Sequence, residues 1–343
     1  MLRRSLSSET IYGIIHLPMK SIVTAVSLLV TLAAVAEARS PINLDILQRD
    51  GYGVVALHHP RPNELLVRAK INDQPVELIL DTGWDAPGNG ISLDKDLARA
   101  LKVQAKAVSG HGVTWAGTKV ATEVGMANSV EMGNTRITGV PLFFGNFGGL
   151  RFMRGTAGTS LMIPESMGTP RGYISIGFLR ATSAVIDLPG LRLYLRPPGT
   201  GKQAMIGPAL KALGLAEVPL SRATQRHLLV DAEVNGMTGK MAIDTGAEFS
   251  MVERRFALKA NASWFNARLE ARDAAGNSKR ADLASIRGFK IGGVPISATN
   301  IALANTALGS FGGIVGLIGM DILGPNWGII DCGQSKLYFS HVK

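Results

Sequence analysis

The chain has few of the residues that covalent and metal-dependent chemistry requires. It has 343 residues and one cysteine, Cys332, which excludes an intramolecular disulfide and a thiolate metal cluster. None of its six histidines has the His-x-x-x-His spacing of a helical metal pair. The sequence has no Gly-x-Ser-x-Gly elbow and no glycine-rich phosphate loop ending in Lys-Ser or Lys-Thr. We therefore expect neither a metal site nor a cofactor.

Positive charge is in excess but not concentrated. The formal net charge is +10, yet no run of lysine or arginine is longer than two. Nucleic-acid sites usually combine clustered basic residues with aromatic stacking platforms, so we expect no nucleic-acid partner. The chain is 46% hydrophobic and 18% charged, with 40 glycines and 16 prolines. This composition is typical of a packed globular protein made of short strands and turns.

Charge is absent from residues 21–35, which follow Lys20 and precede Ala36-Glu37-Ala38. A basic residue, an apolar stretch and small residues near a cleavage site form the layout of a secretory signal. The apolar stretch is short for a membrane span, which takes roughly 20 residues. We expect a signal peptide at 1–38, cleaved after Ala38, and a periplasmic or secreted mature chain without a stable membrane span. The alternative is an uncleaved N-terminal segment that anchors the chain.

The most informative feature of the sequence is an internal repeat. Shifted by 163 residues, the segment 53–83 aligns with 216–246 without a gap. Ten of 31 positions are identical, where average composition would give about two. Each copy ends in Asp-Thr-Gly after an apolar run.

Weaker matches continue the repeat downstream. They place Ile176-Gly177 on Ile318-Gly319 and residues 184–187 on 328–331. Between the halves, residues 196–201 read Arg-Pro-Pro-Gly-Thr-Gly, a composition typical of a linker. We therefore predict two mainly β lobes, at 39–199 and 200–343.

The Asp-Thr-Gly tripeptides carry the candidate chemistry. An apolar strand delivers each carboxyl group, Asp81 and Asp244, into a place of low dielectric constant. The threonine hydroxyl can hold the turn by hydrogen bonds, and the glycine permits a sharp turn and a close approach. One such tripeptide is ordinary turn composition. Two at equivalent positions of a duplicated unit are a much stronger signal.

These motifs, with residues 175–177, 244–250 and 317–323, resemble those of the pepsin–retropepsin clan of aspartic peptidases, most closely its bacterial two-lobed retropepsin-like members. The resemblance covers most of residues 53–343. The second turn matches the family pattern in full. The first turn departs from it, with Trp84 in place of alanine, Pro87 where a hydroxyl is expected, and about three extra residues.

The resemblance implies an all-β fold of duplicated barrel lobes with a central cleft. Asp81 and Asp244 would face each other there and share a proton. One carboxylate would activate a water molecule and the other carboxylic acid would protonate the peptide carbonyl. Thr82 and Thr245 would buttress the pair, and Gly83 and Gly246 would admit the substrate backbone. The implied protein is an aspartic endopeptidase acting on proteins or peptides, as a monomer that is internally a pseudo-dimer.

Family members cover the cleft with hairpin flaps. Residues 110–117 stand at the matching place in the first lobe, where a plain solvent hairpin is the alternative, and residues 273–277 in the second. Candidates for substrate contact in the cleft are Trp84, His111, Trp115 and Ala247.

Trp84 and the altered first turn favour a non-catalytic protein that binds a peptide or polymer, whereas both aspartates and both threonines favour the enzyme. Residues 300–320 are uncharged and contain Gly312, Gly316 and Gly319, a spacing found in some membrane helices. The repeat instead predicts buried strands around a tight turn there. The first lobe also has a surplus near Gly148–Arg171, which predicts an exposed loop.

Overall fold

The computed structural model describes residues 44–59, 64–86, 89–114, 116–147, 170–222, 227–297, 300–310 and 312–340. These belong to one compact unit, Ser40–Lys343. The expected signal peptide, Trp115 and most of the first-lobe surplus lie outside the described residues. The boundary between the lobes at residue 199 stays a prediction.

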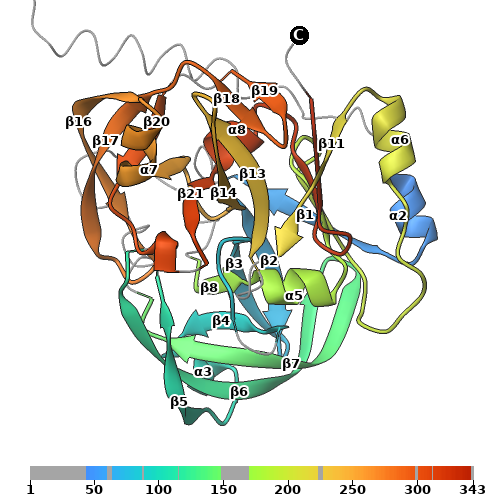
Figure 1. Ribbon diagram of the computed structural model, residues 1–343. Helices are drawn as coiled ribbons and strands as arrows, with labels where there is room; N and C mark the ends of the chain where they lie inside the picture. The colour runs from blue at the N-terminus through green and yellow to red at the C-terminus, as the bar shows by residue number, and fades with distance from the viewer. Residues whose placement is uncertain are drawn as a thin grey trace, which may run out of the picture. The chain divides into compact units, whose positions relative to one another are not determined.

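Strands dominate both halves, and the described helices are short (Figure 1). The elements of the first half are α2 (Asp45–Arg49), β1 (Gly53–His58), β2 (Leu66–Ile71), β3 (Gln74–Leu80), β4 (Ile91–Asp94), α3 (Leu97–Ala100), β5 (Lys106–Val113), β6 (Lys119–Met132), β7 (Thr135–Gly145), β8 (Gly172–Ile174), α5 (Ile176–Ala181), β9 (Val185–Asp187) and β10 (Arg192–Leu195).

The second half repeats this plan. Its elements are α6 (Gly207–Ala212), β11 (Ala216–Pro219), β12 (Ser221–Arg222), β13 (Leu228–Val234), β14 (Met237–Ile243), β15 (Met251–Glu253), α7 (Arg254–Lys259), β16 (Ser263–Arg272), β17 (Ser278–Ser285), β18 (Phe289–Ile291), β19 (Val294–Ile296), β20 (Asn300–Ala304), the 3-10 helix η2 (Leu308–Ser310), β21 (Ile314–Ile318), α8 (Met320–Leu323), β22 (Ile329–Asp331) and β23 (Lys336–Phe339). The predicted fold of duplicated β-barrel lobes is confirmed. The central cleft stays a prediction.

Three strands from each half form a continuous run, in the order β11-β23-β22-β9-β10-β1. At its centre β9 and β22 pair antiparallel, with Ile186 opposite Ile330. The same pairing sets Asp187 opposite Ile329 and Asp331 opposite Val185. Because residues 185–187 and 329–331 are copies related by an offset of 144, this exchange of partners is what an approximate twofold axis requires. The pairing of β9 with β22 therefore shows that the two halves are related by an approximate twofold axis.

In each lobe a hairpin leads into the Asp-Thr-Gly turn, β2–β3 in the first and β13–β14 in the second. A parallel strand then joins the end of the hairpin, with Leu80 beside Ile174 and Ile243 beside Ile318. The N–H of Asp81 donates to the carbonyl of Ile174 at 3.2 Å, and that of Asp244 to Ile318 at 3.0 Å.

This pairing corrects one sequence match. Ile174 occupies the place of Ile318, so the equivalence of Ile176-Gly177 with Ile318-Gly319 is wrong by two residues. The N–H of Ile176 bonds the carbonyl of Trp84 at 2.9 Å, just as the N–H of Met320 bonds that of Ala247 at 2.9 Å. The offset is therefore 144 throughout this part of the repeat. The sequence comparison favoured the wrong register because Ile176-Gly177 and Ile318-Gly319 are identical dipeptides. In the correct register Ile174-Ser175 aligns with Ile318-Gly319, and only the isoleucine is shared.

One identity in the repeat has a clear physical role. Asn72 and Asn235 have φ of 48° and 49°, a left-handed conformation that asparagine tolerates better than most residues. The Oδ1 of Asn72 accepts from the N–H groups of residues 128 and 129, at 2.8 and 3.2 Å. The Oδ1 of Asn235 accepts equivalently from residues 287 and 288, at 2.9 and 3.2 Å. Asn72 therefore fixes its hairpin turn to β6, and Asn235 fixes the equivalent turn to the loop between β17 and β18.

Residues 300–320 form β20, η2, β21 and the start of α8, as the repeat predicts. Within the described part of the chain no helix is long and apolar enough to cross a membrane. Cys332 follows β22 and is fully buried, and burial raises the pKa of its thiol. A buried free cysteine of this kind packs as a small hydrophobic residue.

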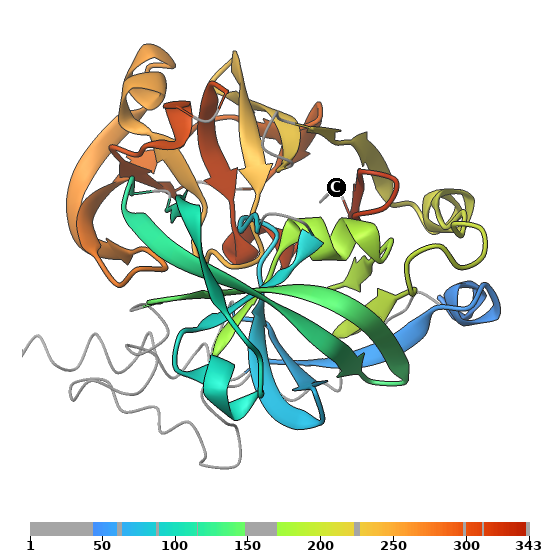
Figure 2. The same ribbon diagram turned by 90° about the horizontal axis from the view of Figure 1, so that it is seen from below.

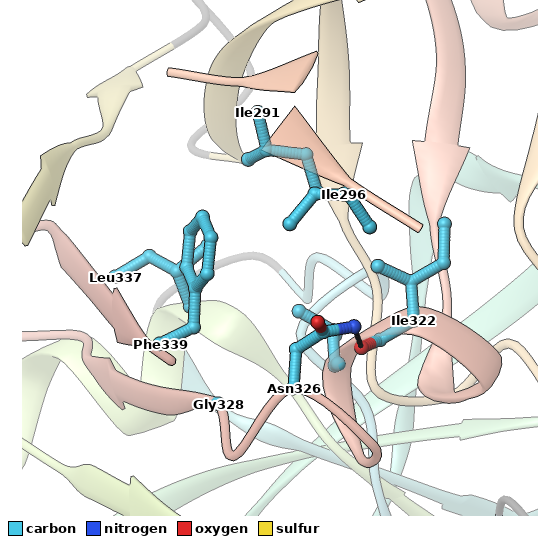
Figure 3. Close-up of a pocket in the computed structure, with 8 residues that line it drawn as sticks. Ile291, Ile296, Ile322, Asn326, Gly328, Leu337 and Phe339 are labelled. Atoms are coloured by element: carbon cyan, nitrogen blue, oxygen red, sulfur yellow. Dashed lines mark hydrogen bonds between the residues drawn. The ribbon is translucent and has the colours of Figure 1, made fainter. Parts of the chain in front are cut away.

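The second lobe also contains a small apolar pocket (Figure 3). Its one polar side chain is Asn326, whose Nδ2 donates to the carbonyl of Ile322 at 2.7 Å. No titratable side chain lines it, so it offers packing space rather than chemistry. The other lining residues are Ile291, Ile296, Leu323, Gly328, Leu337 and Phe339.

Candidate active site

The structure brings the two predicted aspartates together. Asp81 follows β3 and Asp244 follows β14, at the ends of strands related by the pseudo-twofold axis. A Cβ added to Gly83 would overlap the carboxyl group of Asp244, and one added to Gly246 would overlap that of Asp81. Each carboxyl group therefore lies directly against the glycine of the opposite lobe. Only glycine leaves room for this approach.

Four hydrogen bonds between the lobes surround the pair. The Oγ1 of Thr82 donates to the carbonyl of Ile243 at 2.8 Å and accepts from the N–H of Thr245 at 3.0 Å. The Oγ1 of Thr245 donates to the carbonyl of Leu80 at 2.7 Å and accepts from the N–H of Thr82 at 3.1 Å. Both threonines are fully buried. Each hydroxyl thus satisfies two backbone groups of the turn region and fixes the separation of the aspartates.

The electrostatics favour a shared proton. Burial raises the pKa of Asp81 well above its usual range, and the charge of Asp244 raises it further. Burial also raises the pKa of Asp244, to about 6. A side-chain hydrogen bond joins the two carboxyl groups. The Oδ1 of Asp81 is buried without a hydrogen-bond partner among the described residues. The arrangement can therefore hold one carboxylic acid beside one carboxylate, with an acceptor oxygen still available.

The raised pKa of Asp244 predicts a pH-dependent gain in stability for Asp244→Asn. Between about pH 4 and pH 6 the native carboxyl keeps a proton that the unfolded chain releases, so wild-type stability falls as pH rises. The variant has no such titration and should gain up to about 3 kcal/mol on wild type from pH 4 to pH 7. Urea unfolding at both pH values measures this. Asp73→Asn, at an exposed turn, is the control for exchanging a carboxyl group for an amide. Equal effects for Asp244→Asn at pH 4 and 7 would contradict the assignment.

In the second lobe the turn after Asp244 is held by a serine–aspartate pair. The Oγ of Ser250 donates to Oδ1 of Asp321 at 2.6 Å, and the N–H of Ser250 donates to the same oxygen at 2.8 Å. The N–H of Gly319 donates to the Oγ of Ser250 at 2.9 Å. The hydroxyl of the family pattern thus connects the turn to α8.

The first lobe reaches a similar backbone path by other contacts. Ser92 lies opposite Tyr173 in the first lobe, and Met251 lies opposite Leu317 in the second, so Ser92 and Met251 are equivalent positions. The chain takes four more residues to reach Ser92 from Asp81 than to reach Met251 from Asp244, one more than predicted from the sequence. Gly177 takes the place of Asp321. A Cβ at Gly177 would lie 3.2 Å from the Cα of Asn89, so the backbone of the extra residues fills the space that the aspartate uses in the second lobe.

Trp84 is buried, with 9% of its surface exposed. Its Nε1 donates to the Oγ of Ser92 at 2.8 Å. Its ring stacks on Tyr173 and meets Phe147 edge-on, with both centroid distances 5.5 Å. The tryptophan therefore belongs to a packed aromatic cluster beside Asp81. Phe147 and Tyr173 were not among the site residues predicted from the sequence. Tyr173 directly precedes Ile174, a position of the repeat beside the first Asp-Thr-Gly, and this neighbourhood was a signal that could have identified it.

Three of the residues predicted to contact substrate remain to be placed: Ala247, His111 and Trp115. Ala247 is half-buried immediately after the second Asp-Thr-Gly. His111 lies on β5, and the structure does not describe its side chain. Trp115 is outside the described residues. Among those residues no group of three histidine, cysteine, aspartate or glutamate side chains could hold a metal ion.

Two hairpins meet across the lobes, β5–β6 and β16–β17, and their tips lie side by side (Figures 1 and 2). The hydroxyls of Thr114 and Thr118 donate to Oδ2 of Asp273, at 2.7 and 2.8 Å. The Nζ of Lys279 donates to the carbonyl of Ala116 at 2.8 Å. Asp273 is 3% exposed, and its Oδ1 accepts from the N–H of Asn277 at 2.8 Å. The sequence placed hairpins at these positions but gave no sign that Asp273 would join them.

We predict that Asp273→Asn releases the first-lobe tip. The new amide can keep Oδ1 toward Asn277 and so preserve its own turn, but its nitrogen cannot accept from Thr114 and Thr118. Losing hydrogen bonds to a buried charged acceptor costs about 1.5–3 kcal/mol. Amide exchange of Gly117, whose N–H bonds the carbonyl of Thr114, should accelerate by roughly tenfold to a hundredfold. Glu131→Gln, remote from the tips, is the control. Unchanged exchange at Gly117 would show that the tips are not linked by Asp273.

Comparison with known proteins agrees with the duplicated plan. Residues 67–167 match a family model described as an aspartyl protease, and residues 230–325 match one described as a gag-polyprotein putative aspartyl protease. Each matched segment contains one Asp-Thr-Gly. No curated protein matches the chain. A solved structure, basic 7S globulin from soybean, is similar with a TM-score of 0.43 and 11% identity, over 85% of this chain and 96% of that one.

Proposed function

The chain belongs to the pepsin–retropepsin clan, with one aspartyl protease domain in each half, and we propose that it is an aspartic endopeptidase whose catalytic groups are Asp81 and Asp244. One observation carries the proposal: each carboxyl group lies against the glycine of the opposite lobe, within a hydrogen bond of the other. Such a pair has both an acid and a base available at one point.

The proposed reaction proceeds through an activated water molecule. The ionised carboxylate takes a proton from the water, whose oxygen forms a bond to the carbonyl carbon of the peptide. The protonated carboxyl group gives its proton to the carbonyl oxygen, producing a neutral tetrahedral diol. The carboxyl group that took the proton from water then gives it to the amide nitrogen, and the other carboxylate takes a proton from one hydroxyl of the diol. The C–N bond breaks, which leaves a carboxylic acid and an amine, and the pair returns to its starting protonation. The carboxyl groups of Asp81 and Asp244 donate or accept every proton that moves in this scheme.

The roles of the two carboxyl groups follow from their environments. Asp81 is the more deeply buried and faces the charge of its neighbour, so its pKa is raised and it holds the shared proton. Asp244 is half-buried, and its Oδ1 accepts from the N–H of Gly246 at 3.0 Å, which supports its ionised form. We therefore assign Asp244 as the base and Asp81 as the acid at the start of the reaction.

The test is hydrolysis of a denatured protein by the chain without residues 1–38, between pH 4 and pH 8. The rate should rise from pH 4 to about pH 6, because below this range Asp244 is protonated and no base is present. Mass spectrometry of the products identifies cleaved bonds. Absence of cleavage across this range, with folded protein, would favour the second candidate, a peptide- or polymer-binding protein. The observation behind that candidate is the packed Trp84 in the first turn.

The proposed location is the periplasm or the exterior of the cell. It rests on the uncharged segment 21–35 and on Ala36 and Ala38, which lie outside the described residues. N-terminal sequencing of the exported protein should begin at Arg39, and an intact segment 21–35 on a membrane-bound protein would point to the anchor.

A further inference from the structure

The two lobes present different surfaces on either side of the aspartate pair. In β3, Leu78 and Leu80 point into the main core, so Ile79 lies on the opposite face of the strand. In β14, Met241 and Ile243 belong to the main core and Ala242 lies on the opposite face. Because 163 residues separate Ile79 from Ala242, these faces are equivalent under the pseudo-twofold axis.

The strand pairing extends this equivalence to whole clusters. We define the first-lobe wall as the buried cluster Leu66, Ile79, Trp84, Val120, Phe147 and Tyr173. The counterparts of four of these residues are Leu229, Ala242, Ala247 and Leu317, which with Ala302 we define as the second-lobe wall. The same second-lobe cluster also contains Met251, Ala281, Ala304, Leu308 and Ile314. At three of the four matched positions the second lobe has the smaller side chain: alanine for isoleucine, alanine for tryptophan and leucine for tyrosine.

The first-lobe wall is already filled. Its three aromatic rings contact one another at centroid distances of 5.5 Å. The Nε1 hydrogen bond to Ser92 fixes the indole of Trp84. Ala274 and Ala275, from the tip of β16–β17, also pack against this cluster. Little apolar surface is left on this side for a substrate to cover.

The second lobe is more exposed immediately after its aspartate, although the other four residues of the second-lobe wall are buried. Gly246 is exposed and Ala247 half-buried, whereas the matching Gly83 and Trp84 are half-buried and buried. Phe249, two residues beyond Ala247, has 56% of its surface exposed. A bulky apolar side chain placed here would cover the half-buried Ala247 and the exposed ring of Phe249.

We propose that the two walls select side chains of unequal size on the two sides of the scissile bond, a small one beside the first-lobe wall and a bulky apolar one beside the second. In an extended peptide, successive side chains point in opposite directions. A scissile bond centred on the aspartate pair therefore directs its two flanking side chains to walls related by the twofold axis. Trp84 and Ala247 are the residues that determine this preference. The inference rests on the proposed peptidase function.

The experiment uses four matched peptides that differ only in the two residues flanking one bond: Ala-Phe, Phe-Ala, Phe-Phe and Ala-Ala. Wild type should cut one of the two mixed orders about tenfold to a hundredfold faster, in kcat/KM, than Phe-Phe, as expected when a side chain meets a filled site. The exchange variant Trp84→Ala/Ala247→Trp should prefer the other mixed order. Ala247→Trp alone alters a half-buried position, so it should fold and should lose the advantage of the bulky residue. Trp84→Phe provides a milder change if Trp84→Ala does not fold.

Binding separates this inference from the proposed function. Asp81→Asn, which cannot complete the acid–base cycle, is titrated with the same four peptides carrying a fluorophore. Tighter binding of one mixed order, without cleavage by wild type, supports the size selection and overturns the peptidase function. Equal binding or equal cleavage of both mixed orders and Phe-Phe overturns the size selection. Unaltered relative rates in Ala247→Trp also overturn it.

Discussion

Replacing either aspartate by asparagine is expected to lower kcat/KM for peptide hydrolysis by at least about a thousandfold. Asp81→Asn keeps the size of the side chain but cannot supply the proton, and Asp244→Asn cannot accept one. The double variant should be little worse than either single variant, because members of one catalytic unit are not additive. The measurement is kcat/KM on the best peptide near pH 6.

Asp321→Asn is the matched control for these variants. Asp321 is a carboxyl group in the second lobe that accepts from Ser250 through Oδ1, which asparagine also carries. It should retain activity within about tenfold. If Asp81→Asn retained activity and Asp244→Asn did not, Asp81 would have only a structural role in its turn. A second copy of the chain would then have to supply the other carboxyl group.

Removing the hydroxyl of Thr82 or Thr245 is expected to cause the largest loss of stability of any single-atom change near the site. Thr82→Val preserves shape but leaves the carbonyl of Ile243 and the N–H of Thr245 without their partner. Each buried unsatisfied group costs about 1–3 kcal/mol, so we expect unfolding to become easier by about 2–5 kcal/mol. Thr245→Val should have a similar effect through Leu80 and Thr82.

Serine provides the control for both threonines. Thr82→Ser keeps the two hydrogen bonds and removes one buried methyl group, which costs about 1 kcal/mol. Urea denaturation of the three proteins gives the comparison, and kcat/KM should fall in the valine variants as the aspartates lose their fixed separation. Equal stability of Thr82→Val and Thr82→Ser would mean that the four hydrogen bonds between the lobes contribute little to stability.

The duplicated fold could be predicted from sequence because its signals are local. An apolar strand, Asp-Thr-Gly and a left-handed asparagine each impose a backbone geometry that two copies must share. The identities at Asp81/Asp244 and Asn72/Asn235 are therefore readable without a structure. The two reciprocal threonines were also predictable as a support for the pair, although their exact partners, backbone groups of the opposite lobe, depend on how the lobes associate.

The contacts that differ between the lobes could not be read in the same way. Trp84 departs from the family pattern, and sequence alone left open whether it projects toward substrate or packs inward. Its burial depends on Phe147 and Tyr173, which are 63 and 89 residues away along the chain. Similarly, Gly177 can replace Asp321 only because four extra residues pass nearby. Such compensation involves several distant positions at once, and no single motif records it.

The linkage of the hairpin tips is a second example. Asp273 looked like an ordinary turn residue, because its short-range hydrogen bond to the N–H of Asn277 accounts for its place in the sequence. Its two hydroxyl partners, Thr114 and Thr118, lie about 160 residues earlier. Only the association of the lobes brings them within reach.

The pairing of β9 with β22 within one chain has a genetic consequence. In a symmetric dimer of identical half-size chains, every codon change appears twice, once on each side of the axis. Here each half has its own codons, so a mutation at residue 84 leaves residue 247 unchanged. The continuous β-sheet keeps the two halves in the same spatial arrangement while their sequences diverge. Covalent duplication thus allows the two sides of the candidate site to evolve separately.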